Sequence, residues 1–148
     1  MRIAYCSDLH IDLSNLKFVD GFVSRVRELR CEKLIIAGDL IECAMLIDEE
    51  LPYYGDVDHK NQAIVFFKAL ASIQDLEVYW IFGNHEYYNC DINTAVERTK
   101  GFLVENNLHH VKILDNEIVD FGETQLIAST LWTNYNNQNP VVMESCRY

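Results

Sequence analysis

Features that would place a chain in a membrane or a secretory pathway are absent from this sequence. No apolar run approaches the length of a membrane span, and the opening residues hold no apolar stretch long enough for a signal peptide. The five cysteines are scattered and include no CxxC pair, which argues against a disulfide framework and a zinc knuckle. We therefore expect reduced thiols and a cytoplasmic protein with no membrane partner.

Basic residues are also scarce. The chain has 12 lysines and arginines against 23 acidic residues, which gives a formal net charge of -11. This charge would repel a nucleic-acid backbone at long range, so nucleic acid is not the favoured partner. A phosphate substrate is not excluded, because bound divalent cations can invert the sign of a pocket locally.

The remaining composition is that of one globular domain. The chain has 148 residues, 49% of them hydrophobic and 24% charged, and this length can bury a sizeable core. Short β-rich runs at residues 2–6, 33–37 and 78–82 alternate with helix-spaced apolar residues at 18–29 and 63–73. This alternation predicts an α/β fold with a parallel sheet and helices on both faces. Ser14 or Asn15 is the expected N-cap of the first helix.

The second part of the chain predicts a different arrangement. A third helix is expected at residues 91–106, followed by strand-like runs at 111–114, 117–121 and 125–132. Turn-forming pairs separate these runs, so a meander or hairpin of antiparallel strands should follow the βαβαβ part. Residues 42–60 are acidic and are expected to form a surface loop. No interdomain linker divides the chain, and we treat residues 1–148 as a single domain.

Polar residues follow each of the three expected parallel strands. They are Asp8-Leu9-His10 after the first strand, Gly38-Asp39 after the second and Gly83-Asn84-His85-Glu86 after the third. Ligand crevices in open α/β sheets lie beyond the carboxyl ends of the strands, so these side chains can converge. Carboxylate, imidazole and amide oxygen together suit borderline divalent ions such as Mn²⁺, Zn²⁺ or Fe²⁺.

The backbone of these segments carries further expectations. Asp8 and His10 are two positions apart and point to the same side if the strand continues that far. Gly38 and Gly83 suit sharp strand exits that need a positive φ or a close backbone approach. Asp39 could bridge two ions about 3.5–4 Å apart, which is the spacing of two-metal sites.

Taken in order, these segments resemble the first three motifs of the calcineurin-like metallophosphoesterases. The matching residues are Ser-Asp-Leu-His at 7–10, Gly-Asp-Leu at 38–40 and Gly-Asn-His-Glu at 83–86. The resemblance covers roughly residues 1–90 by motif, and residues 127–133 resemble the strand that follows in bacterial and phage members. It implies the N-terminal half of a β-sandwich with flanking helices. It also implies a phosphoester hydrolase in which two divalent ions (Mn, Fe, Zn or Ni) activate water.

The same resemblance implies roles for particular residues. Asp8, His10 and Asp39 would hold the first metal. Asp39 and Asn84 would hold the second. His85 would lie near the leaving group as a general acid, or would stabilise charge on the phosphoryl oxygens. The substrate would be a phosphomonoester or phosphodiester of a small molecule, a nucleotide or a phosphoprotein.

The chain departs from the family pattern after these motifs. The family continues with Gly-His and Gly-His-x-His motifs on two later strands, whereas this chain has no histidine after His110. The second metal then keeps only the two inferred donors, so we expect its site to be defective. The second half-sheet is missing too, which leaves an apolar edge open to self-association. We expect a C-terminally truncated domain of low activity; the alternative is a non-catalytic remnant or binding module.

The candidate ligands also have structural alternatives. Asp8 and His10 could be incidental polar residues of a strand-end turn, Asp39 could cap a helix, and Asn84 could be a turn residue with left-handed backbone. Their joint placement favours ligation over each of these alternatives.

Other polar residues near the motifs are expected to be structural. Glu86 should be a surface residue or a support for the ligands. His109 and His110 lie at an expected helix exit, where the helix dipole favours histidine, so a metal role is not the favoured one.

Overall fold

The chain is described here by a computed structural model, which covers residues 1–13, 16–47, 58–132, 137 and 139–141. The elements in chain order are β1 Ile3–Cys6, α1 Leu16–Leu29, β2 Lys33–Ala37, α2 Ala44–Ile47, α3 His59–Ala71, β3 Glu77–Ile81, the 3-10 helix η1 His85–Tyr87, α4 Ala95–Glu105, β4 Val111–Leu114, β5 Glu117–Asp120 and β6 Gln125–Ala128. Within these ranges no helix is both long enough and apolar enough to span a membrane.

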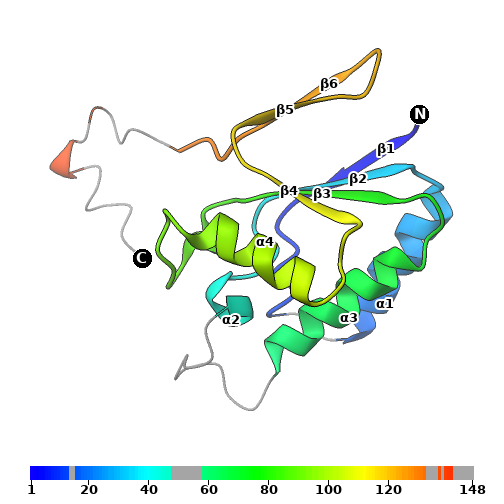
Figure 1. Cartoon of the computed structure of the whole chain (residues 1–148), viewed down its shortest axis with the longest axis horizontal. Helices are drawn as coiled ribbons and strands as arrows, with labels where there is room; N and C mark the ends of the chain where they lie inside the picture. Colours follow the sequence, from blue (N-terminus) through cyan, green and yellow to red (C-terminus); the bar gives the residue numbers. More distant parts are fainter. Residues whose placement is uncertain (14–15, 48–57, 133–136, 138, 142–148) are drawn as a thin grey trace.

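The centre of the molecule is a four-stranded parallel sheet in the order β1-β2-β3-β4 (Figure 1). Ile3 lies opposite Lys33, Lys33 opposite Glu77, and Val78 opposite Val111. Because all the strands run the same way, β1, β2 and β3 end at one edge of the sheet. The expected α/β class and the βαβαβ order are confirmed.

The expected antiparallel part is only partly right. β5 and β6 form a separate antiparallel hairpin, with Ile118 opposite Ile127. Residues 111–114, however, form β4, which pairs in parallel with β3 and extends the main sheet. The meander is therefore wrong and the hairpin is confirmed. The reason is that α4 is a full crossover helix, which returns the chain to the edge of the sheet in the parallel sense.

Most element boundaries agree with the sequence patterns, but α4 begins at Ala95 and not at residue 91. The Asp91 carboxylate accepts a hydrogen bond from the Asn93 backbone N–H at 3.0 Å, and the Asp91 carbonyl accepts one from Thr94 N–H. This local turn occupies the residues that the periodic pattern assigned to the helix. The N-cap expected at Ser14 or Asn15 lies outside the described residues.

The two faces of the sheet have different partners. Leu34 and Ile36 of β2, with Val78 and Trp80 of β3, belong to the large core shared with the helices. The alternate positions face a smaller cluster that includes the hairpin residues Val119, Phe121, Leu126 and Ala128. Figure 1 shows the helices on one side of the sheet and β5–β6 on the other. Helices on both faces were expected, and this was wrong: the hairpin covers the second face at β3 and β4, and Tyr5 of β1 is left 84% exposed.

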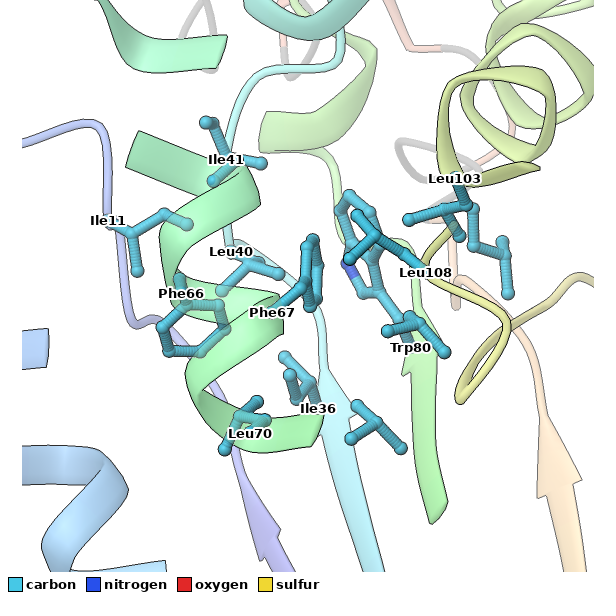
Figure 2. Close-up of a cluster of buried hydrophobic side chains, with 14 of the residues drawn as sticks. Ile11, Ile36, Leu40, Ile41, Phe66, Phe67, Leu70, Trp80, Leu103 and Leu108 are labelled. Atoms are coloured by element: carbon cyan, nitrogen blue, oxygen red, sulfur yellow. The ribbon is translucent and has the colours of Figure 1, made fainter. Parts of the chain in front are cut away.

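The large core is centred on aromatic side chains from α3 and β3. Figure 2 shows Phe66 and Phe67 of α3 among the buried aliphatic side chains, with Trp80 beside Phe67. Phe66, Phe67 and Trp80 are fully buried, and the rings of Phe67 and Trp80 are 5.7 Å apart between centroids. α3 therefore packs its apolar stripe directly against the middle of the sheet.

The prediction of a surface loop at residues 42–60 is wrong for those of its residues that the structure describes. Glu42 is 6% exposed, and α2, which follows it, buries Ala44, Met45 and Leu46. The backbone N–H of Cys43 donates to the carbonyl of Glu86 at 3.0 Å, which holds the start of this segment beside β3. Residues 48–57 lie outside the described residues. The acidic composition of the whole segment concealed its apolar beginning.

The amino ends of β2, β3 and β4 are joined by a charge cluster. The Glu77 carboxylate accepts hydrogen bonds from the ammonium groups of Lys33 and Lys112. These contacts, first that with Lys112 and then that with Lys33, lower the pKa of Glu77 to about 2. The cluster lies at the end of the sheet opposite to the strand exits.

Glu77 should make the stability of the fold depend on acid pH. Its pKa falls from 4.5 to about 2 on folding, so its stabilisation is complete above pH 4.5 and is lost as the pH falls toward 2. We expect the difference in free energy of unfolding between the wild type and Glu77→Gln to shrink over this range. Urea unfolding at several pH values measures it, with the exposed Glu105→Gln as the control. A difference independent of pH would contradict the cluster.

Replacing Phe67 should test the aromatic core. Phe67→Ala removes a fully buried ring, and such truncations cost about 3–5 kcal/mol. Val65→Ala is the matched control, because Val65 lies on the same helix and is 42% exposed; it should change stability by no more than about 0.5 kcal/mol. Chemical denaturation measures both, and equal losses would contradict this assignment of the core.

Candidate metal centre

The residues after β1 and β2 reach the sheet edge through left-handed backbone. Asp8, His10 and Asp39 have φ values of 55°, 40° and 55°. β1 ends at Cys6, so the strand does not continue to Asp8 and His10, and the condition under which they would point to the same side is not met. The two loops run alongside each other instead: Asp8 N–H donates to the Gly38 carbonyl and His10 N–H to the Asp39 carbonyl, each at 3.0 Å.

Gly38 and Gly83 let the loops after β2 and β3 touch. Gly38 has a φ of 89°, and a Cβ added to it would lie 2.8 Å from the Cα of Gly83. A Cβ added to Gly83 would lie 2.2 Å from the Asp39 Oδ1. Neither contact is possible for a residue with a side chain. The expected sharp exit and close approach are therefore confirmed, and the approach brings the third motif against Asp39.

Two groups of ligand atoms result from these loops. Asp8, His10 and Asp39 form the first group, here called the carboxylate-rich cluster, and its ligand atoms all lie within 4.8 Å of one another. His10, Asp12 and His85 form the second, here called the histidine-rich cluster, whose ligand atoms also all lie within 4.8 Å of one another. His10 belongs to both. The structure thus brings together three of the four expected metal ligands, and their role as ligands stays a prediction.

His85 lies directly against these clusters. Its backbone N–H donates to the Asp39 Oδ1 at 3.1 Å, and its ring stands edge-on to that of His10, with 4.6 Å between the centroids. Its Nε2 lies 3.2 Å from the Asp12 Oδ2 and 4.0 Å from the Glu42 Oε1. The expected catalytic residue is therefore flanked by two largely buried acids.

Asn84, the fourth expected ligand, adjoins the clusters in the chain. Its φ is -73°, in the right-handed region, so the turn residue with left-handed backbone is not what the structure has. Its Nδ2 donates to the Tyr88 hydroxyl at 2.9 Å. Because the amide nitrogen is used in this way, the carbonyl oxygen is the Asn84 atom suited to a cation.

Glu86 holds the strand exits together. Its side chain is fully buried, and it accepts hydrogen bonds from the backbone N–H groups of Asp39, Leu40 and Gly83 at 2.7–2.9 Å. The Trp80 indole donates to it at 3.1 Å. Burial raises the pKa of the Glu86 carboxyl, and these four donors oppose that rise. Of the two expected roles, the surface position is wrong and the support for the ligands is what the contacts describe.

Asp12 is a site residue that the sequence analysis missed. It lies in the turn after His10, and its side chain is 1% exposed. The Oδ1 atom is buried without a hydrogen-bond partner within the described part of the chain. The signal was in the sequence, because Asp8, His10 and Asp12 repeat a polar residue at every second position.

His109 and His110, which were expected to be structural, lie away from the candidate metal centre. The ring Nε2 of His110 is 2.9 Å from the Phe67 carbonyl oxygen. Burial lowers the pKa of His110, which favours a neutral ring that packs at the end of α3. Neither His109 nor His110 belongs to the ligand clusters found among the described residues.

A large open cleft lies beside the clusters rather than over them. Its volume is about 1220 Å³, and its walls come from the hairpin side of the sheet, with Tyr87, Tyr88, Leu131 and Trp132 among the lining residues. Gly83 and Asn84 also line it, whereas the residues of the two clusters do not. Among the described residues, Gly83 and Asn84 of the third motif therefore connect the cleft with the centre.

The residues of the centre fit a divalent cation. Carboxylates and imidazoles converge from three loops, and a buried acid keeps an oxygen atom without a hydrogen-bond partner in the described chain. A buried carboxylate in this state is costly unless a positive charge compensates it. The mixed oxygen and nitrogen donors suit Mn²⁺, Fe²⁺, Zn²⁺ or Ni²⁺ without selecting one of them.

This chain is similar to known proteins in sequence and in structure. A sequence model of the family described as calcineurin-like phosphoesterase matches residues 1–140. An uncharacterised protein of Acanthamoeba polyphaga mimivirus is 31% identical over 140 residues, which are 90% of this chain and 45% of the viral protein. The crystal structure of the Pseudomonas putida nuclease MPE aligns with a TM-score of 0.46 at 19% identity, covering 81% of this chain and 50% of that chain. The chain spans about half the length of these relatives.

Glu86→Gln should weaken the fold strongly. The substitution replaces one acceptor oxygen by an NH₂ group that faces N–H donors, so at least one buried donor loses its partner. We expect a loss of at least about 2 kcal/mol in the free energy of unfolding. The exposed Glu105→Gln is the control and should be neutral. A Glu86→Gln chain as stable as the wild type in urea would contradict the supporting role.

Proposed function

We propose that this chain, which belongs to the calcineurin-like phosphoesterase family, carries the metal-binding part of an enzyme that hydrolyses phosphoesters with metal-activated water. One observation supports the proposal above the others: the ligand atoms of Asp8, His10 and Asp39, which follow two different strands, lie within 4.8 Å of one another. A convergence of this kind at the carboxyl edge of a parallel sheet is typical of a ligand site.

Each residue has a proposed task. Asp8, His10 and Asp39 hold the first ion. Asp39 and the carbonyl oxygen of Asn84 provide the donors for a second, weaker one. A bound divalent ion supplies activated water and neutralises charge on the phosphoryl group. His85, beside Asp39, acts on the leaving group as a general acid or stabilises the phosphoryl oxygens.

The proposed substrate is a phosphomonoester or phosphodiester of a small molecule, a nucleotide or a phosphoprotein. The net charge of -11 disfavours a long nucleic acid, because its backbone would be repelled everywhere except at a metal-loaded centre.

A second candidate function is that of a non-catalytic binding module that keeps the first half of the fold. The absence of any histidine after His110 favours it for these 148 residues, because the second ion has only two proposed donors. Both candidates bind a cation at the carboxylate-rich cluster, and they differ in whether hydrolysis follows.

Asp39→Asn should separate the proposed centre from an incidental group of acids. Asparagine tolerates left-handed backbone and retains an acceptor for the His85 N–H, so the loop should keep its conformation. We expect the wild type to bind one Mn²⁺ ion weakly and to hydrolyse bis-p-nitrophenyl phosphate slowly, and Asp39→Asn to lose both. Calorimetry and a colorimetric assay measure the two properties.

His85→Ala is the matched variant for the chemical step. It should retain Mn²⁺ and lose hydrolysis, because His85 is outside the carboxylate-rich cluster. Mn²⁺ binding without hydrolysis in the wild type would support the binding module instead. Full Mn²⁺ affinity in Asp39→Asn would contradict both candidates.

A further inference from the structure

The buried carboxylate of Asp12 is not accounted for by the proposed function. Its Oδ2 atom lies 3.2 Å from the His85 Nε2, and its Oδ1 atom has no hydrogen-bond partner among the described residues. Since the side chain is 1% exposed, solvent does not compensate its charge. An acid in this position needs a positive charge close by.

The separation between Asp12 and His85 fits a shared cation. Two ligand atoms bound to one tetrahedral ion at about 2.0–2.1 Å are about 3.4 Å apart. The observed 3.2 Å between the Asp12 Oδ2 and the His85 Nε2 is close to that value. The same distance also suits a hydrogen bond, so a third donor is needed to decide between the two explanations.

His10 supplies the third donor. One ligand atom from each of His10, Asp12 and His85 lies within 4.8 Å of the other two. The two rings stand at 86° to each other, so they approach edge to face and do not stack. Two imidazoles and one carboxylate form a donor set that transition metals occupy in other proteins, with positions left for water or ligand.

We propose that His10, Asp12 and His85 form a second cation site, distinct from the carboxylate-rich cluster and selective for ions that prefer imidazole, such as Zn²⁺. Nitrogen donors favour Zn²⁺ over Mn²⁺, whereas the two carboxylates of the other cluster suit the harder Mn²⁺. The two sites share His10 and therefore compete. On the proposed function, in which His85 acts on the leaving group, an ion held by His85 would withdraw that side chain from a substrate and so inhibit hydrolysis.

Metal titrations of the purified 148-residue chain test this site without any substrate, so the result does not depend on phosphoester hydrolysis. The probes are ZnCl₂ and MnCl₂, followed by calorimetry. Asp12→Asn should weaken Zn²⁺ binding by at least about tenfold, since loss of even an outer-shell partner costs about 10–100-fold, and should leave Mn²⁺ binding unchanged. Asp8→Asn should weaken Mn²⁺ more than Zn²⁺. Asp20→Asn, an exposed acid on α1, is the matched control.

Unchanged Zn²⁺ affinity in Asp12→Asn would overturn the proposal and leave Asp12 and His85 as a hydrogen-bonded pair. If Asp12→Asn loses both metals, the loop has been disrupted and His85→Gln decides. Selective loss of Zn²⁺ in His85→Gln then supports the site, and loss of both metals or of neither overturns it.

Discussion

The geometry of the candidate centre depends on the buried carboxylate of Glu86. Its two oxygen atoms accept from Asp39 and Leu40 on the loop after β2 and from Gly83 on the loop after β3. These backbone groups lie just beyond the ends of their strands, where the sheet no longer pairs them. An unpaired buried N–H is costly, so one side chain both satisfies the loops and fixes their separation. The positions of Asp39 and His85 follow from that separation.

The same loops contain backbone that is unfavourable on its own. Asp8, His10 and Asp39 all have positive φ, which costs most residues of the order of 1 kcal/mol or more. Aspartate and histidine are both enriched in this region compared with most residues, which limits the cost at all three positions. Asp8 and His10 on the loop after β1 donate backbone hydrogen bonds to the carbonyls of Gly38 and Asp39 on the loop after β2, so the two loops hold each other in these unfavourable conformations. These conformations bring the ligand atoms of Asp8, His10 and Asp39 within 4.8 Å of one another.

The sequence predicted the features that depend on local pattern. The strands, the helices α1 and α3, and the convergence of Asp8, His10 and Asp39 follow from apolar spacing and from the order of the motifs. It did not predict that residues 111–114 join the parallel sheet, because strand propensity carries no information about pairing partners. It also did not decide whether Glu86 is a surface residue or a support for the ligands, and it did not identify Asp12 as a site residue. Both are acids whose burial is decided by residues far away in the chain.

These two buried acids show how hydrogen bonding can separate a structural carboxylate from a candidate ligand. Glu86 accepts four hydrogen bonds, so its lone pairs are directed at N–H groups and little of its charge is left for an ion. Asp12 has one imidazole neighbour and an oxygen atom without a partner in the described chain. Burial alone would have ranked Glu86 first as a ligand, since it is the more deeply buried of the two. The number of protein donors reverses that order, because a cation binds where the protein has left a carboxylate oxygen unsatisfied.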